Sequence, residues 1–250
     1  MFPYKDENPT ELTPVVTVGI IALNLLAWVF VQGVGAEEPL ARSVCHLGLI
    51  PGEVLGTAPA GTSVPLGPGV RCVLTAEPHW WTVLTSMFMH GGWFHIIGNM
   101  WFLWVFGNNI EDSMGHARFV VFYLLCGVAA AAAQMVVAPR SVVPMVGASG
   151  AISGVMGAYT LLYPRVRVHT LVTLGFFVTT VTLPAYVMLG YWFVLQLLMG
   201  AVGALSPTEG GVAVWAHVGG FLTGLLLVKL FANPEFLERR RAGVFLPRDA

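Results

Sequence analysis

The stretch Ala117–Val137 reads ARFVVFYLLCGVAAAAAQMVV and contains a single charged side chain, Arg118. An α-helix needs roughly 20 predominantly apolar residues to cross the hydrocarbon core of a bilayer, so this stretch can span a membrane. The rest of the chain has the same character, because 56% of its 250 residues are hydrophobic and only 10% are charged. A soluble domain carries about 25% charged residues. The sequence therefore predicts a membrane protein.

Five further apolar stretches resemble this one in length and composition. They cover about residues 14–34, 93–110, 148–163, 185–205 and 212–231. The expected fold class is all-α, a polytopic membrane protein with a bundle of six transmembrane helices. We expect a core over residues 14–231, preceded by an N-terminal segment (1–13) and followed by a basic tail (232–250).

Residues 168–205 can be divided in more than one way. They are apolar enough for one long span or two short ones, and Pro184 separates the two parts. The part before Pro184 is short for a crossing and rich in Thr and Val. We interpret that part as an interfacial segment that leads into a span at about 185–205.

The basic residues favour six spans and set their orientation. Cytoplasmic loops of membrane proteins carry an excess of Lys and Arg. With six spans, nine basic residues fall on one side and three on the other, whereas a seventh span would move the basic tail outside. We therefore expect a multi-pass protein of the cell membrane with both termini in the cytoplasm and the long loop 35–92 outside. The richer side holds Lys5, Arg118, Arg165, Arg167, Lys229, Arg239, Arg240, Arg241 and Arg248, and the other holds Arg42, Arg71 and Arg140.

Three other features limit the class of protein. The net charge is −1 and the basic residues form no nucleic-acid-binding face, so we expect no nucleic-acid partner. The first 14 residues lack a basic segment followed by a cleavage site, so we expect no removed signal peptide. Cys45 and Cys72 both lie in the loop 35–92. They would form a disulfide in an oxidising compartment or remain two free thiols.

A serine lies at the start of the fourth predicted span, in the run Gly147-Ala148-Ser149-Gly150. Gly147 and Gly150 permit unusual backbone dihedrals and close approach, which would leave the Ser149 hydroxyl and the local amides accessible. A serine hydroxyl becomes a nucleophile when a base accepts its proton. The alternative is that Ser149 is one of several small residues at a helix contact.

The candidate base is His217, the one histidine in the last predicted span. Gly220 and Gly224 follow at +3 and +7, so they share its helical face. Faces of small residues allow two helices to pack closely, which would bring His217 within hydrogen-bond reach of Ser149. Ionisable residues inside a membrane are usually functional. The alternative is a histidine satisfied by a backbone carbonyl.

A third polar group lies at the start of the second span, in the run His90-Gly-Gly-Trp-Phe-His95-Ile-Ile-Gly-Asn99. His95 and Asn99 are four residues apart and share a helical face. Together with the backbone N–H of Ser149 they could stabilise an oxyanion. His90 precedes the helix, where it could organise these donors. Two alternatives are a polar stripe that ties helices together and a zinc site with His217, but no HExxH motif is present.

The carboxylates lie far from these residues. Glu111 and Asp112 end the second span on the cytoplasmic side, about a membrane thickness from Ser149. A Ser-His-Asp triad is therefore not expected, and a Ser149–His217 dyad remains. We expect Glu111 to pair with backbone donors of a neighbouring loop.

Three motifs in this order resemble the rhomboid family of intramembrane serine proteases. They are His90-Gly-Gly-Trp-Phe-His95-Ile-Ile-Gly-Asn99-Met100, then Gly147-Ala-Ser149-Gly150, then Ala216-His217-Val-Gly-Gly220-Phe-Leu-Thr-Gly224. The resemblance covers about residues 14–231. It implies Ser149 as nucleophile, His217 as base and His95, Asn99 and the Ser149 amide as the oxyanion hole.

The resemblance also implies supporting roles for His90, Gly147, Gly150 and Gly220, and no metal or cofactor. The loop at about 206–211 would act as a lid over a water-filled cavity. The position four after Ser149, aromatic in some members, is Ser153 here. The expected partners are membrane lipid and transmembrane protein substrates, whose peptide bonds would be hydrolysed near the outer membrane surface.

Other classes of protein fit the sequence less well. A catalytically inactive rhomboid-like protein that binds membrane clients would usually lack Ser149 or His217. A transporter would more often show internal repeats or carboxylates inside the membrane. An α/β-hydrolase needs G-x-S-x-G between a strand and a helix, and the fifth position here is Ala151.

Overall fold

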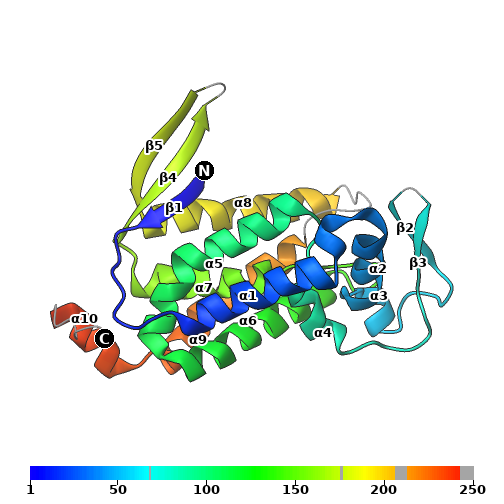
Figure 1. Ribbon diagram of the computed structural model, residues 1–250, viewed down its shortest axis with the longest axis horizontal. Helices are drawn as coiled ribbons and strands as arrows, with labels where there is room; N and C mark the ends of the chain where they lie inside the picture. Colours follow the sequence, from blue (N-terminus) through cyan, green and yellow to red (C-terminus); the bar gives the residue numbers. More distant parts are fainter. Residues whose placement is uncertain (68, 175–176, 206–212, 243–250) are drawn as a thin grey trace.

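The computed structural model describes residues 1–67, 69–174, 177–205 and 213–242. Its main body is a bundle of long helices that lie side by side (Figure 1). These helices begin and end close to the predicted spans. They are α1 (Val15–Phe30), α5 (Trp93–Met114), α6 (His116–Val137), α7 (Ser149–Leu162), α8 (Ala185–Leu205) and α9 (Val214–Phe231).

The helices differ in how well they could cross a membrane. By length and apolar composition, α6, α8 and α9 are the described helices that can do so, whereas α1 and α7 are apolar but shorter. Helix α7 lies inside the bundle in contact with α5, α6, α8 and α9, and its residues 150–159 are all buried. A helix with neighbours on every side needs less lipid-facing surface than one at the periphery.

Helices α7 and α9 make their contact through glycine. A Cβ on Gly220 would lie 2.0 Å from the carbonyl oxygen of Gly150, and one on Gly224 would lie 1.9 Å from that of Gly154. No side chain fits at either point, so the two backbones touch directly. This contact brings the first turn of α7 against the first turn of α9, as the small-residue faces of the two segments predicted.

One end of the bundle, called the loop end here, carries the segment between α1 and α5. This segment is not a plain loop, because it contains short helices and a hairpin. A disulfide joins Cys45 to Cys72 and so ties α2 to β3, which resolves the alternative that the sequence left open. The elements are η1 (Gly33–Gly35), α2 (Glu37–Leu47), α3 (Pro51–Val54), β2 (Ser63–Gly67), β3 (Val70–Val73), α4 (Thr82–Thr85) and η2 (Ser86–Phe88).

The other end, called the tail end here, carries a three-stranded antiparallel sheet and α10 (Pro234–Ala242). The sheet has the order β1-β4-β5 and consists of β1 (Phe2–Asp6), β4 (Arg167–Leu174) and β5 (Phe177–Pro184). The prediction of an all-α fold is therefore confirmed only in part, because the described chain is mostly helical but also contains β-strands. The run before Pro184 is rich in Val and Thr, and this composition suits paired strands, because β-branched side chains pack well on a pleated surface.

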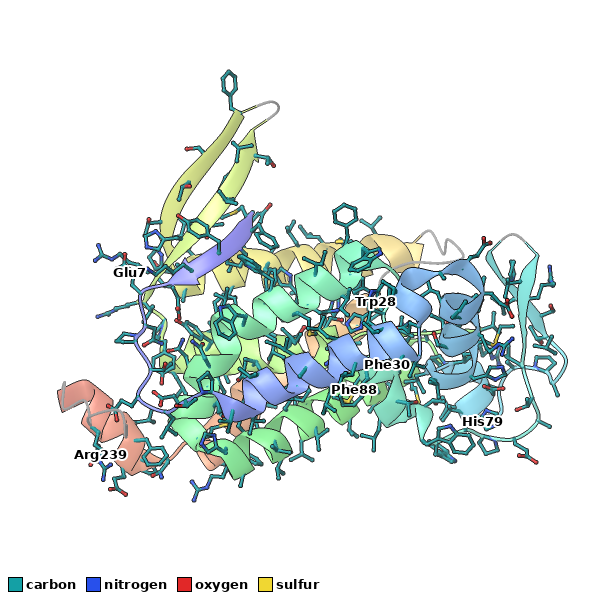
Figure 2. All side chains as sticks on the ribbon, in the orientation of Figure 1. Glu7, Trp28, Phe30, His79, Phe88 and Arg239 are labelled. Carbon is teal, nitrogen blue, oxygen red and sulfur yellow. A yellow bond between two sulfur atoms is a disulfide. The ribbon has the colours of Figure 1, made fainter. Side chains whose placement is uncertain are left out.

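Figure 2 shows the two ends through labelled side chains, with Glu7 and Arg239 at the tail end and His79 at the loop end. At the tail end, two buried carboxylates of α5 hold the N-terminus of α1. Glu111 accepts hydrogen bonds from the N–H groups of Val16 and Thr17 at 2.9 and 2.8 Å. Asp112 accepts one from the N–H of Leu12 at 2.7 Å. Negative charge at a helix N-terminus is stabilising, and the expectation that Glu111 pairs with backbone donors is confirmed.

Candidate active site

Ser149 is the first residue of α7 at the loop end, and its hydroxyl faces His217 on α9. The distance between Ser149 Oγ and His217 Nε2 is 2.7 Å, which is a short hydrogen bond. The glycine contact between α7 and α9 places the two side chains opposite each other. The structure therefore brings together two polar residues that are 68 positions apart in the sequence.

The other ring nitrogen of His217 contacts a residue that the motifs did not indicate. Gln196 on α8 is buried, and its Oε1 lies 2.9 Å from His217 Nδ1. An amide oxygen only accepts hydrogen bonds, so Nδ1 carries the proton of the neutral ring. Nε2 is then free to accept the hydrogen of the Ser149 hydroxyl. A lone glutamine in an apolar span is the signal that could have identified this residue from sequence.

Helix α8 also supplies an aromatic neighbour for the imidazole. The ring centroids of Trp192 and His217 are 5.7 Å apart, and Trp192 lies one turn before Gln196. In α7 the position four after Ser149 is Ser153, whose hydroxyl donates to the Ser149 carbonyl at 2.6 Å. The His217 ring is thus contacted by side chains of α8 and by Ser149, and Ser153 bonds the backbone of its own helix.

His95 on α5 presents a donor beside Ser149. The Gly91 N–H donates to His95 Nδ1 at 3.2 Å, so the proton of the neutral ring is on Nε2. Gly147 has a φ of 124°, which side-chain-bearing residues rarely adopt. A Cβ on Gly147 would lie 2.7 Å from His95 Nε2. Because Gly147 has no side chain, the space next to the His95 Nε2–H donor stays free.

Asn99 lies one turn after His95 on the same face of α5. Its Nδ2 is buried and has no hydrogen-bond partner among the described residues. That nitrogen is 3.5 Å from the point where a Gly147 Cβ would lie. Leaving a buried donor unsatisfied costs about 1–3 kcal/mol, so a native protein keeps such a group where a ligand will use it. His95 and Asn99 together form a pair of donors beside the Ser149 hydroxyl.

A cavity of about 580 Å³ opens over these groups and is lined by Ser149, His217, His95 and Gly150. Several small or apolar residues line the rest of it, among them Gly127, Ala130 and Ala131. Another cavity of about 660 Å³ lies at the tail end beside Lys229, and none of the predicted site residues lines it. A third cavity, of about 610 Å³, lies at the loop end beside Glu37, Arg42 and His46. Of these three cavities, the one of about 580 Å³ contains the hydrogen-bonded Ser149 and His217.

His90 lies before α5 begins and is completely buried. Its ring is 5.1 Å from that of His95, centroid to centroid. Neither ring nitrogen has a hydrogen-bond partner within the described part of the chain. Burial, followed by the neighbouring His95, lowers the pKa of His90 to about 3, so this ring is neutral at pH 7. A neutral His90 adds no repulsive charge beside His95.

Gln32 holds the backbone of His90 from both sides, and sequence reasoning did not identify it. Its Oε1 accepts from the His90 N–H at 2.8 Å, and its Nε2 donates to the His90 carbonyl at 2.7 Å. This clamp fixes the turn whose next residue, Gly91, donates to His95. Gln32 belongs to no motif, but it is the one glutamine in the predicted span 14–34, which is the same weak signal that Gln196 carries.

The loop at about 206–211, expected as a lid, lies outside the described residues. Within the described ranges, no group of three His, Cys, Asp or Glu side chains is arranged to hold a metal ion.

A serine hydroxyl bonded to a neutral, oriented imidazole and flanked by unsatisfied donors is the arrangement found in serine hydrolases. Here it lies between apolar helices of a membrane protein. The class defined by the fold and the site is therefore a helical membrane protein with a hydrolase-like Ser-His pair.

Comparison with known proteins gives the family. The model of the rhomboid domain matches residues 77–234, which include all three motifs and helices α5 to α9. The chain belongs to the rhomboid family.

The relatives come from bacteria, plants and animals. Rhomboid protease GluP of Bacillus subtilis is 30% identical over 162 residues, which cover 65% of this chain and 28% of that protein. Rhomboid-like protein 11, chloroplastic, of Arabidopsis thaliana is 29% identical over 62% of this chain and 54% of its own length. Presenilin-associated rhomboid-like protein, mitochondrial, of Mus musculus is 31% identical over 57% of this chain and 36% of its own length. The chain thus spans about half or less of these relatives.

Proposed function

We propose that this chain is an intramembrane serine endopeptidase that hydrolyses peptide bonds in or near transmembrane segments of other membrane proteins. The observation that carries the proposal is the 2.7 Å contact between Ser149 Oγ and His217 Nε2 inside a cavity. The family includes proteins named as proteases, such as Rhomboid protease GluP. The proposed oxyanion hole consists of His95, Asn99 and the backbone N–H of Ser149.

The reaction starts with transfer of the Ser149 proton to His217 Nε2 while Oγ attacks the peptide carbonyl. The carbonyl oxygen becomes an oxyanion beside His95 Nε2 and Asn99 Nδ2. These donors are in place before the reaction, so they stabilise the developing charge without reorganisation. The imidazolium of His217 then protonates the leaving amine, and the acyl group remains on Ser149.

Water completes the cycle. A water molecule in the cavity gives a proton to His217 Nε2 and attacks the acyl carbonyl, and the same donors hold the second oxyanion. Collapse of this intermediate releases the new carboxyl end and returns the proton to Ser149. The cavity supports this step because it lies at the loop end, close to the bundle surface, where water can enter.

Gln196 acts as a positioning residue in this scheme. Its oxygen keeps the proton of the neutral imidazole on Nδ1 and continues to accept that bond when the ring is charged. In many serine proteases a buried carboxylate does this. A neutral amide places no charge between the helices, which suits a site inside a bilayer, where a charged side chain is costly.

The proposed topology follows from the site and the basic residues. All six long helices cross the cell membrane, including α1, α5 and α7, with membrane lipid around the bundle. The excess of Lys and Arg in the connections at the tail end supports a cytoplasmic position for that end and for both termini. The loop end, with its disulfide, then faces the extracytoplasmic side, where disulfides persist.

The substrate must unwind before it can react, because the carbonyls of a transmembrane helix are hydrogen-bonded within the helix. Transmembrane segments with Gly or Pro near the outer membrane surface should therefore be preferred. The test uses purified protein in liposomes with two model substrates, a poly-Leu helix and the same helix with Gly-Pro at its outer end. We expect cleavage of the second substrate alone by wild type and of neither by His217→Ala. Equal cleavage of both substrates would contradict the unwinding step.

A second candidate function is binding of membrane clients without cleavage, because several relatives are named only as rhomboid-like. Capture of the Gly-Pro substrate by wild type, without any cleavage and without modification of Ser149 by a serine-directed probe, would favour this alternative.

A further inference from the structure

The hairpin β4–β5 is built from side chains of two kinds. Its register pairs Val168 with Leu183, Thr170 with Val181 and Leu171 with Thr180. Directly paired residues point to the same side of a sheet, and successive residues point to opposite sides. The register therefore divides the side chains of the hairpin into two faces.

One face points toward the bundle. Val168 and Thr170 are on it, and both are completely buried. Beyond the edge of the bundle the same face continues to Phe177 at the end of the hairpin, and the Phe177 side chain is 80% exposed. We call this the inner face. It comprises Val168, Thr170, Val172, Phe177, Thr179, Val181 and Leu183.

The opposite face, called the outer face here, is more polar. It carries Arg167, His169 and five further residues of the hairpin, three of which are threonines. Lys5 of β1 pairs with His169 and adds a cation to it. The members of this face are Arg167, His169, Leu171, Thr173, Val178, Thr180 and Thr182. The hairpin is therefore amphipathic, with its apolar side on the same side as the bundle.

The end of this hairpin near Phe177, which lies beyond the bundle, would be unstable in water. A hairpin of two strands is only marginally stable by itself. An exposed apolar strand at a sheet edge also promotes aggregation. Figure 1 shows that the hairpin extends away from the bundle at the tail end, at a steep angle to the long helices. No described helix covers the end of the hairpin near Phe177. Within the described ranges, nothing covers the inner face beyond the bundle.

The lipid leaflet around the bundle is in the right place to cover this face. The long helices lie in the hydrocarbon layer of the membrane. The inner face is turned toward these helices, so it also faces that layer. The apolar surface continues from the hairpin to α8, where Tyr186 and Val187 in the first turn are exposed. Tyr is enriched at the membrane–water interface. Lys5 lies on the outer face, where anionic lipid headgroups and water would be found. Arg167 lies on the same face and forms an ion pair with Glu7 at 2.7 Å.

The attachment of the sheet to the bundle keeps this orientation. Trp101 Nε1 on α5 donates to the Pro3 carbonyl at 2.7 Å, and Asn109 Nδ2 donates to Asp6 at 2.9 Å. These bonds fix β1, and β1 pairs with β4. The hairpin is therefore held in one position relative to the helix axes.

We propose that the β1-β4-β5 sheet is a membrane-surface element that lies on the lipid leaflet at the end away from Ser149. Its inner face contacts phospholipid at the boundary between headgroups and acyl chains, with Phe177 inserted beyond the bundle. Amphipathic elements of this kind lie about 5–10 Å deep in that boundary. The proposal requires that the chain is embedded in a membrane and is independent of its peptidase activity.

Thr179 and Thr180 provide a matched test, because they are neighbours of the same residue type on opposite faces. Each is replaced separately, Thr179→Cys and Thr180→Cys, and labelled with a nitroxide in liposomes of phosphatidylethanolamine and phosphatidylglycerol. Wild type gives the background, since Cys126 is buried and Cys45 and Cys72 form a disulfide. Oxygen, which concentrates in lipid, and a water-soluble nickel chelate then report the environment of each label.

We expect the label at 179 to be reached by oxygen and protected from the nickel chelate, and the label at 180 to show the reverse. Equal access of the nickel chelate to both labels would place the sheet in water and overturn the proposal. Protection of the label at 179 from both reagents, with spin–spin coupling between labels on two copies, would assign the inner face to a second copy and overturn it as well.

Discussion

The buried polar groups near the two ends of helix α5 differ in their hydrogen bonding, although Glu11 Oε1 at the tail end is also buried without a described partner. At the tail end, both oxygens of Glu111 and of Asp112 accept hydrogen bonds from the N-terminal segment and α1. At the loop end, His90 and Asn99 have side-chain nitrogens that are buried without a hydrogen-bond partner in the described structure. Asn99 lies in the second turn of α5, and Glu111 and Asp112 lie in its last turn, so one helix carries both kinds of group.

The difference distinguishes buried groups that stabilise the fold from buried groups that take part in the proposed reaction. A satisfied buried group adds stability and gains nothing from a ligand, whereas an unsatisfied donor beside a cavity gains a partner when an oxyanion forms. Changes at the tail end should therefore affect folding, and changes at the loop end should affect rate. Four substitutions test this contrast.

The largest effect is expected for His217→Ala. Removal of the proposed base leaves Ser149 with no proton acceptor, and the rate of peptide hydrolysis should fall on the order of 10⁶-fold, the cost of removing the catalytic histidine of subtilisin. The measurement is the cleavage rate of the Gly-Pro substrate in liposomes. The control is His46→Ala, because His46 is exposed on α2, and its rate should be unchanged. A His217→Ala protein that cleaves at the wild-type rate would exclude the dyad.

Asn99→Ala should lower the cleavage rate by about 10²–10³, the usual cost of losing one oxyanion donor. The unfolding midpoint should stay near that of wild type, because the Asn99 amide nitrogen has no protein partner to lose. Asn24→Ala is the matched control, since the Asn24 amide is buried in α1 and donates to the Ile20 carbonyl. It should show the opposite pattern, a lower midpoint and an unchanged rate per folded molecule. A stability loss alone in Asn99→Ala would assign Asn99 to packing.

At the tail end, Glu111→Ala should destabilise the fold by about 3 kcal/mol, because the donors of Val16 and Thr17 lose their acceptor. Thermal unfolding in detergent measures this change. The control is Glu38→Ala, which removes an ion pair to Arg42 whose partners are 70% and 73% exposed. Exposed pairs contribute about 0–1 kcal/mol. A Glu111→Ala protein with normal stability and reduced kcat would remove the contrast between the two ends.

The smallest effect is expected for Gln196→Met, which keeps the size of the side chain and removes the acceptor for His217 Nδ1–H. Loss of one hydrogen bond of about 1.4 kcal/mol lowers kcat roughly tenfold. KM should not change, because Gln196 does not line the cavity. Gln196→Glu retains an acceptor oxygen and should restore most of kcat. Equal rises in KM for both variants would indicate a disturbed cavity instead.

The sequence was sufficient to predict the helices and not the sheet. Long apolar runs such as Ala117–Val137 leave few alternatives to a helix, and α6 begins and ends within one residue of that run. Residues 168–184 carried a different signal, an enrichment in Val and Thr. This composition is typical of strands, but the partner strand β1 lies more than 160 residues earlier in the chain. Pairing over such a distance is not visible in a local pattern.

The candidate site was predictable only where several residues formed a motif. Ser149, His217, His95 and Asn99 each occur in a run with glycines, and the structure places them around one cavity or beside it. Gln196 and Gln32 are single amides with no repeated spacing around them. Their importance depends on which groups they face, His217 Nδ1 and the His90 backbone, and this is determined by helix packing.

The central claim is that Ser149 is a nucleophile activated by its contact with His217. The most direct test is covalent labelling of the protein in liposomes with a fluorophosphonate, followed by mass spectrometry of the modified peptide. Ser153→Ala is the matched control, because Ser153 lies one turn further along α7. We predict modification of Ser149 in wild type and in Ser153→Ala, and none in Ser149→Ala or His217→Ala. Unchanged labelling of the Ser149→Ala protein would contradict the account.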